Sequence, residues 1–287
     1  MTSTSLTNAL TFDIEEYFQV SAFENVIERS EWDQWESRVE FATNRILDLL
    51  AAHNTKATFF TLGLVAEKHP ELIQRIVRDG HELGCHGYQH VRITQQTAGE
   101  FRADIERAKG ILEDIGGVSL DGYRAASFSI NKSNFWAFTE IAAAGFSYSS
   151  SVYPVKHDLY GIPDAPRVPF KPVDELDLVE IPVSTVRIGG RNFPAGGGGY
   201  FRLYPYLVTR HFLRRLHKTE GNNANMYFHP WEFDPEQPRP EGVSAKTQFR
   251  HYLNQEKSLN RLARLLEDFS WSTMRDVYRT SIFSNAA

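Results

Sequence analysis

Cysteine, excess basic charge and long apolar runs are what this sequence has least of. Among 287 residues there is one cysteine, Cys85, so an internal disulfide and a cysteine-rich zinc site are excluded. No stretch reaches the roughly 18 consecutive apolar residues of a membrane-spanning helix. The first residues, MTSTSLTNALTF, lack the basic and apolar segments of a signal peptide. We therefore expect a soluble, cytoplasmic protein.

Acidic residues outnumber basic ones. The formal net charge is -5 and the pI is about 6.1, which argues against general nucleic-acid binding, because that needs a basic face. A hydrophobic share of 41% is enough for a full core. Neither an internal repeat nor a clean domain boundary is visible, so residues 1–287 are expected to form a single domain.

Phosphate-binding loops are also missing. The sequence contains neither G-x-G-x-x-G nor a Walker A motif, and the glycine run AGGGGY at 195–200 lacks the Gly-Lys-Ser/Thr that a phosphate loop requires. Two interpretations of this run stay open: a flexible turn, or a mobile loop at the rim of a site.

Short apolar runs alternate with helical patterns along the chain. Eight runs favour strands: 9–14, 56–62, 81–86, 120–125, 146–150, 178–184, 225–229 and 270–274. Pro70 suits the first turn of a helix that ends at Gly80, and Thr97 with Glu100 forms a capping box. This order indicates an α/β protein with parallel strands, most simply an irregular (β/α) barrel of about seven strands. The segments 151–177 and 232–250 are expected to be long loops.

Two histidines, His86 and His90, lie four residues apart in GHELGCHGYQHVRI. Side chains at this spacing can point the same way and hold one metal ion. Ten histidines in the chain make the pair alone weak evidence. In the H-E-x-x-H motif a glutamate supplies the base, but here that position is Gly87. A third ligand and a base must therefore come from elsewhere.

Polar residues end several of the apolar runs, and these ends meet at one face of a barrel. The residues are Asp13 followed by Glu15 and Glu16, then His86, Arg124 and His229. Each alone has an ordinary alternative, such as a strand-end cap, a structural ion pair or a core histidine. Together, an acid and two histidines make a site for Zn²⁺ or a similar divalent ion with open coordination positions. Cys85 is expected in the core.

The same residues lie in motifs that resemble the polysaccharide deacetylases of carbohydrate esterase family 4, the NodB-homology domain. TFDIEEYF, HGYQH, GYRAASFSI and MYFHPW resemble four motifs of that family. More narrowly, TFDIEEYFQV, SSVYP and HPWEFDPEQPR resemble the cytosolic deacetylases encoded with exopolysaccharide and exosortase systems. The resemblance implies an irregular (β/α) barrel with a family-specific extension from about residue 232.

The resemblance also implies a role for each residue. His86 and His90 would ligate the metal, Asp13 would be the general base, Arg124 would hold that base, and His229 would be the general acid. The family's usual second aspartate is replaced by Ile14, so Glu15 is expected as the third ligand, with Glu16 pointing away. Other departures are Gly87 for Ser or Thr, Ala126 for proline, and Ser149 for an aspartate that often orients the acid histidine.

The implied reaction is removal of acetyl groups from N-acetylated amino sugars of a polysaccharide or its lipid-linked precursor, with zinc as the expected cofactor. A backbone N–H near Ser127 would assist the oxyanion, and Trp231 and Tyr200 would contact the sugar. Two alternatives stay open: a small-molecule amidohydrolase of the same barrel type, and a glycan-binding domain without catalysis. The basic stretch 206–218 is either a solvated face or a contact with a membrane or lipid-linked sugar.

Overall fold

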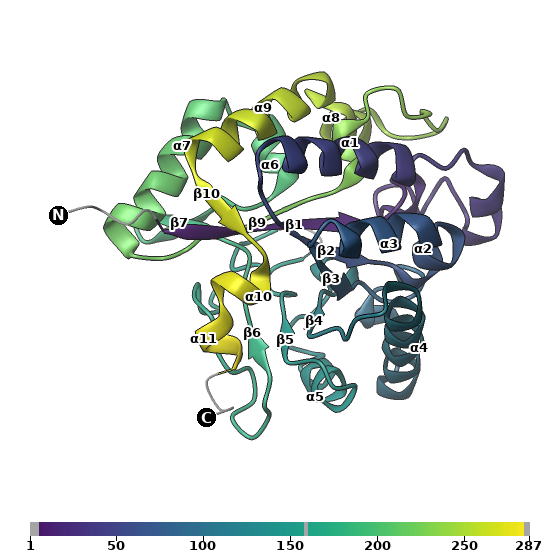
Figure 1. The fold of residues 1–287 in the computed structure, drawn as a ribbon, viewed down its shortest axis with the longest axis horizontal. Helices are drawn as coiled ribbons and strands as arrows, with labels where there is room; N and C mark the ends of the chain where they lie inside the picture. Colours follow the sequence, from purple (N-terminus) through teal and green to yellow (C-terminus); the bar gives the residue numbers. More distant parts are fainter. Residues whose placement is uncertain (1–5, 158–159, 284–287) are drawn as a thin grey trace.

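The computed structural model describes residues 6–157 and 160–283, and its central feature is a parallel sheet curved into a barrel (Figure 1). Neighbouring strands run in the order β10-β1-β2-β3-β4-β5-β6, and β9 also pairs with β1. The strands are β1 (Thr7–Ile14), β2 (Thr58–Thr61), β3 (Glu82–Cys85), β4 (Gly122–Tyr123), β5 (Tyr148–Ser149), β6 (Val179–Glu180), β9 (Asn225–Phe228) and β10 (Ser270–Ser272). The predicted irregular (β/α) barrel is confirmed.

Helices cover the outside of the barrel (Figure 1). They are α1 (Val39–Ala52), α2 (Gly63–Lys68), α3 (Pro70–Arg78), α4 (Ala98–Gly116), α5 (Trp136–Ala143), α6 (Gly198–Leu203), α7 (Tyr206–Arg215), α8 (Ala245–Tyr252), α9 (Gln255–Asp268), α10 (Met274–Val277) and α11 (Arg279–Ile282). Helix α4 begins at the predicted capping box, since the Thr97 hydroxyl accepts a hydrogen bond from the Glu100 N–H. It ends at Gly117, whose φ of 64° favours glycine.

Short helical turns follow several strands and carry much of the site. They are η1 (Tyr17–Gln19), η2 (Arg29–Gln34), η3 (Ile93–Gln95), η4 (Ala126–Phe128), η5 (Leu216–Glu220) and η6 (Pro230–Phe233). No helix among residues 6–157 and 160–283 has the length and apolar character needed to cross a lipid bilayer.

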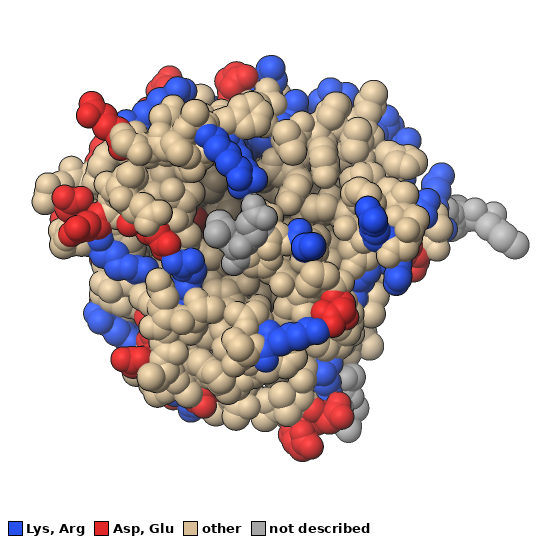
Figure 2. All heavy atoms as spheres, turned by 180° about the vertical axis from the view of Figure 1, so that it is seen from behind, with Lys and Arg blue, Asp and Glu red and all other residues tan. Residues whose placement is uncertain are grey.

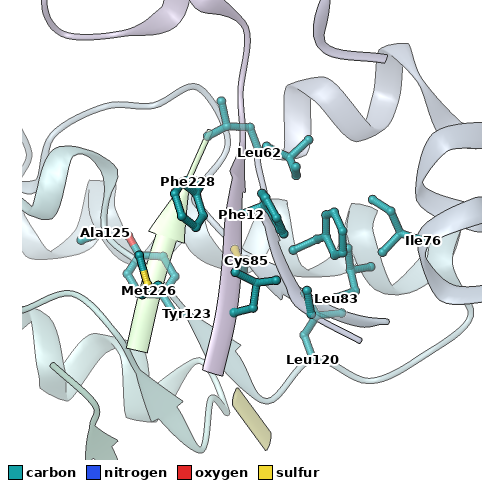
Figure 3. Close-up of a cluster of buried hydrophobic side chains, with 14 of the residues drawn as sticks. Phe12, Leu62, Ile76, Leu83, Cys85, Leu120, Tyr123, Ala125, Met226 and Phe228 are labelled. Atoms are coloured by element: carbon teal, nitrogen blue, oxygen red, sulfur yellow. The ribbon is translucent and has the colours of Figure 1, made fainter. Parts of the chain in front are cut away.

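Alternation along β1 decides which side chains face the helices and which face the barrel interior. Leu10, Phe12 and Ile14 belong to the main hydrophobic cluster between sheet and helices, where the Phe12 ring lies 5.3 Å from that of Phe59 (Figure 3). Successive side chains of a strand point to opposite faces, so Asp13 points into the barrel. Cys85 is fully buried in the same cluster, as expected.

The barrel closes where the chain beyond β6 meets β9. The Ser184 N–H donates to the Asn225 carbonyl over 3.1 Å, and the Asn225 N–H donates to the Ser184 hydroxyl over 2.7 Å. Strands β9 and β10 both pair with β1. Segments far apart in the sequence therefore complete one sheet around the first strand.

Two parts of the fold differ from the prediction. The run 178–184 continues into an antiparallel hairpin of β7 (Thr185–Ile188) and β8 (Arg191–Pro194). Its turn is Gly189-Gly190, both with positive φ, which suits a two-residue hairpin. The prediction of a loop over 232–250 is wrong at both ends of the segment. Its first residues belong to the turn η6, and its last residues belong to α8, which is followed by α9.

Candidate functional site

The carboxyl ends of the strands surround a cavity of about 210 Å³. Its walls include the acids and histidines that the sequence analysis singled out: Asp13, Glu15, His86, His90 and His229. Ser127, Trp231 and Glu232 also line it. Parallel strands deliver these residues to one place because their carboxyl ends lie at the same end of the barrel.

Glu15, His86 and His90 form a group that could hold a metal ion. Ligand atoms of the three residues all lie within 4.8 Å of one another. Glu15 Oε2 is 2.8 Å from His90 Nε2 and 3.9 Å from His86 Nε2. Despite these approaches, Oε2 is buried without a correctly aligned hydrogen-bond partner among the described residues. One carboxylate oxygen and two imidazole nitrogens converging in this way are a donor set that fits a divalent metal ion.

The protonation states of these residues also fit a metal. Burial lowers the pKa of His86 to about 4, so its imidazole is neutral, as a ligand must be. The His86 Nδ1–H donates to the Arg124 carbonyl over 2.8 Å, which leaves Nε2 free to face Glu15. Burial alone would raise the pKa of Glu15, but His90, His229 and His86 outweigh it and hold the pKa well below its usual range. Glu15 is therefore ionised.

A loop, not a helical turn, brings His86 and His90 together. His86 directly follows β3, and the backbone then passes through positive φ at Gly87 (82°) and His90 (54°). The first angle explains why glycine occupies position 87. The second is uncommon for a residue with a side chain. The Arg29 guanidinium supports this conformation by donating hydrogen bonds to the carbonyls of Gln89 and His90.

Asp13 is tied to Arg124 deep in the barrel. Arg124 is fully buried, and its Nη1 donates to Asp13 Oδ1 over 2.6 Å and to the Thr11 hydroxyl over 2.7 Å. Its remaining donors bind the carbonyl and hydroxyl of Ser150. Because Oδ1 is engaged, the other carboxylate oxygen of Asp13 is free to act, and it lies 3.9 Å from His229 Nε2.

His229 has a carboxylate partner that the sequence analysis missed. Its Nδ1 lies 3.0 Å from Glu232 Oε1, three residues further along the same turn. Burial alone would lower the pKa of His229, but Glu15, Glu232 and Asp13 raise it to about 9. Its other nitrogen, Nε2, faces Glu15 Oε1 over 3.7 Å. The sequence HPWE carried the signal, since both residues lie on one short turn.

The Glu232 carboxylate packs against Gly198 so closely that a side chain at position 198 would not fit. A Cβ added to Gly198, at the start of α6, would lie 1.7 Å from Glu232 Oε2. Arg202 on the same helix is 2% exposed, with its Nε 3.8 Å from that oxygen. The glycine run 195–199 is not a simple turn, because Gly198 and Gly199 begin α6, which packs against Glu232, and Gly199 lines the cavity.

Trp231 lines the cavity, but its ring lies between two histidine rings. The indole is stacked between the rings of His229, at 4.9 Å, and His251, at 4.2 Å. Its Nε1–H donates to Glu15 Oε1 over 3.2 Å. Both faces of the ring are covered, so Trp231 orients a candidate metal ligand and offers the cavity an edge only.

The other two predicted substrate contacts differ from each other. Ser127 lines the cavity, has a φ of 53°, and its hydroxyl lies 2.6 Å from that of Ser21. Tyr200 is not among the residues that line the cavity; its ring packs 5.8 Å from that of Tyr204. The aromatic residues that line the cavity beside Trp231 are Phe128, Tyr160 and Tyr227. A contact between Tyr200 and the sugar stays a prediction.

Glu16 points away from the metal group, as expected, but it has a role of its own. Its Oε2 accepts hydrogen bonds from the N–H groups of Arg38 and Val39, at 2.9 and 3.1 Å. These donors belong to the first turn of α1, so Glu16 caps that helix from a distance.

Comparisons with known proteins divide the chain into two matches. Residues 7–146 match the family described as polysaccharide deacetylase, and residues 150–279 match a domain of unknown function, DUF3473. A peptidoglycan-N-acetylglucosamine deacetylase of Bacillus cereus is 43% identical over 77 residues, which cover 27% of this chain and 28% of that protein. A second such deacetylase, from Listeria monocytogenes, is 33% identical over 90 residues, 31% of this chain and 19% of that protein. The matches thus span under a third of these relatives.

A solved structure extends the likeness to the whole fold. A putative polysaccharide deacetylase from Mycobacterium smegmatis superposes with a TM-score of 0.63 at 20% identity. The superposition covers 96% of this chain and 90% of that one. At this identity the likeness concerns the fold.

Proposed function

We propose that this chain, whose residues 7–146 match the polysaccharide deacetylase family, is a metal-dependent hydrolase that removes acetyl groups from N-acetylated amino sugars. The observation that carries the proposal is the convergence of three groups of interacting side chains at one cavity. They are the Glu15–His86–His90 group, the Asp13–Arg124 ion pair and the His229–Glu232 pair. Each chemical role in amide hydrolysis has a candidate residue there.

The protein's own groups would carry the protons. Asp13, held at Oδ1 by Arg124, takes the proton of the attacking water on its free oxygen. His229, charged and held at Nδ1 by Glu232, gives a proton from Nε2 to the departing amine nitrogen. The products are acetate and a free amine. Since Asp13 Oδ2 and His229 Nε2 lie 3.9 Å apart, base and acid face the same reacting group.

Glu15, His86 and His90 would hold the metal ion, and zinc is the ion we propose. When bound, it would supply Lewis acidity to the acetyl carbonyl and make water a nucleophile at neutral pH. Two imidazoles and one carboxylate are a set found in catalytic zinc sites. Trp231 keeps Glu15 in place through its indole N–H.

The surroundings of the cavity support a polymeric substrate. A second cavity of about 500 Å³ shares the walls Val20, Ser21 and His90 with the first. When one sugar of a polymer occupies the first cavity, the next sugar of the chain could therefore occupy the second. Amide side chains of Asn25 and Gln95 line the second cavity. Such groups suit the hydroxyls of a glycan.

The setting of the reaction is a further part of the proposal. The motifs shared with cytosolic exopolysaccharide-associated deacetylases favour a role in exopolysaccharide biosynthesis, in the cytoplasm, with all 287 residues acting as one domain. The exposed cations Arg214 and Lys218 near the end of the 206–218 stretch favour contact with a membrane surface or a lipid-linked sugar.

Mass spectrometry of candidate N-acetylated glycans after incubation tests this function, with metal content measured on the same sample. Loss of acetyl groups by metal-loaded protein is expected. A metal-free protein that opens cyclic ureides would instead favour the amidohydrolase alternative. Saturable glycan binding with no product under any divalent metal would favour the binding domain.

A further inference from the structure

Another cavity, which we call the cationic cavity, lies away from the catalytic cavity and from its 500 Å³ neighbour. It has a volume of about 1090 Å³ and lies between the β7–β8 hairpin and residues 154–156 and 163–168. It shares no lining residue with the cavity that contains Glu15 and His229. The two cavities are therefore spatially separate.

Positively charged side chains outnumber negatively charged ones in the walls of the cationic cavity. The cations that line it are Lys156, Arg167, Arg187 and Arg191. Asp164 is the one acid among the described lining residues, and it already pairs with Lys132. Arg167 pairs with Glu220 over 2.6 Å. The other three cations have no ion-pair partner in the part of the chain that the structure describes.

The cavity is held in shape by hydrogen bonds between its walls. The Asn192 amide of the hairpin donates to the carbonyls of Pro154, at 3.0 Å, and Pro163, at 3.3 Å. Arg167 donates to the Thr185 hydroxyl over 2.8 Å. These bonds join residues 154–156 and 163–168 to both strands of the hairpin, so the cations are presented on a preorganised surface.

Helix α7 continues the positive surface. Arg215, at its end, donates to the Arg187 carbonyl over 3.1 Å, so the helix touches the hairpin. Figure 2 shows the molecule from behind, and on the side that carries α7 and β7 in Figure 1 several Lys and Arg side chains are exposed with few acidic ones among them. A polyanionic or anionic surface is the electrostatic complement of this side.

Apolar side chains next to these cations narrow the choice of partner. Val168, which lines the cavity, is 43% exposed, and the hairpin residues Ile188 and Phe193 are each 39% exposed. A free phosphate ion would use the cations alone. A membrane surface offers phosphate groups to the cations and an apolar boundary to the exposed hydrophobic side chains.

We propose that the β7–β8 hairpin and the cavity beside it bind the phosphate groups of anionic lipids at a membrane surface. Arg187, Arg191 and Lys156 contact the headgroup phosphates, while Ile188 and Phe193 enter the interface. This contact holds the protein at the membrane and leaves the catalytic cavity chemically unchanged.

Vesicle co-sedimentation tests the proposal with Arg187→Gln/Arg191→Gln. Wild-type protein is expected to bind vesicles that contain phosphatidylglycerol and to ignore pure phosphatidylcholine. Each cation near an anionic surface contributes about 1 kcal/mol, so the double variant should bind roughly 25-fold more weakly. The matched control is Arg78→Gln/Lys257→Gln, which removes the same charge from exposed positions outside the cavity. It should bind like wild type.

Three results would overturn the proposal: no binding of wild type to anionic vesicles, equal weakening in both double variants, or saturable binding of inorganic phosphate without any vesicle binding. The last would assign the cavity to a free phosphate. Acetate release from a short soluble oligosaccharide by Arg187→Gln/Arg191→Gln should match wild type. Because this readout is separate, failure of the proposed deacetylation and failure of the membrane contact are distinguishable.

Discussion

His229 Nδ1 lies 3.0 Å from Glu232 Oε1, and the two residues belong to one turn after β9. This pairing orients the imidazole so that Nε2 faces Asp13 and Glu15. Relatives with an aspartate near position 149 would supply the carboxylate from another strand. Here Ser149 cannot do so, and its hydroxyl instead bonds that of Ser151 over 2.8 Å. The carboxylate that pairs with His229 in this protein lies on the histidine's own turn.

Glu232→Gln should lower kcat and leave KM nearly unchanged. The amide keeps the shape of the side chain but cannot stabilise the charged imidazole, so a loss of about 10- to 100-fold in kcat is expected, as for other groups that orient a functional histidine. Steady-state kinetics and metal content measure the effect. A wild-type kcat in metal-loaded Glu232→Gln would show that this pair does not assist catalysis.

Two helical glycines offer an independent test of the same pairing. Gly198→Ala places a Cβ against Glu232 Oε2 and should displace the carboxylate, with a loss of activity comparable to that of Glu232→Gln. Gly110→Ala, on α4 and outside the cavity, meets no heavy atom within 4 Å and is the control, with activity near wild type. Equal activity of both alanine variants would contradict the packing argument.

The candidate metal group predicts one divalent ion per chain. His86→Ala should lose the ion and the activity together, because two remaining ligands hold zinc poorly. His211→Ala, at an exposed position on α7, is the matched control and should keep both. Elemental analysis of purified protein measures occupancy. Full occupancy in His86→Ala would remove this residue from the site.

The three acids after β1 should separate by role. Asp13→Asn should bind metal normally and turn over very slowly, because the amide cannot accept the proton of water. Glu15→Gln should bind metal weakly and regain part of its activity in excess metal. Metal titration with acetate release distinguishes them. If Glu15→Gln binds metal as tightly as wild type while Asp13→Asn loses it, the two roles are reversed.

Glu16→Gln belongs to the same set but should affect folding. The glutamate accepts two backbone N–H groups of α1, and loss of a helix cap costs about 0.5–2 kcal/mol. Its metal affinity should equal that of wild type. Urea unfolding measures the change, and a metal defect would give Glu16 a role at the site.

Protein stripped of metal should show a pH-dependent stability from His229. Its pKa is raised from 6.5 to about 9, chiefly by Glu15 and Glu232 against the effect of burial. A raised pKa means that the charged form is bound more favourably in the folded state. This stabilisation is complete below about pH 6.5 and is lost as the pH rises through about 9. The stability difference between wild type and His229→Gln should shrink over that range. A constant difference would contradict the raised pKa.

Much of the fold could be predicted because strand runs and helix caps are local signals. The capping box at Thr97 lies where α4 begins, and each of the eight apolar runs contains or overlaps one strand of the main sheet. The convergence of Asp13, His86 and His229 followed from the rule that parallel strands end at the same face. The roles proposed for these residues remain predictions.

The rest depended on contacts that no local pattern reveals. Trp231 was expected to be free for a sugar, but His229 and His251 cover its two faces. Glu232 was missed because the family resemblance implied an acid at position 149, on another strand. The β7–β8 hairpin was missed because its strands are partly polar, although its Gly-Gly turn was a usable signal.

Adding zinc back to the stripped protein tests the central claim most directly, with acetate and free amine measured on an N-acetylated oligosaccharide. We expect no release without metal, a rise proportional to added zinc up to one equivalent per chain, and equal amounts of acetate and amine. His86→Ala should stay inactive in the same titration. Full acetate release by the stripped protein, or none at one equivalent of zinc or of any other divalent metal, would contradict a metal-dependent deacetylase.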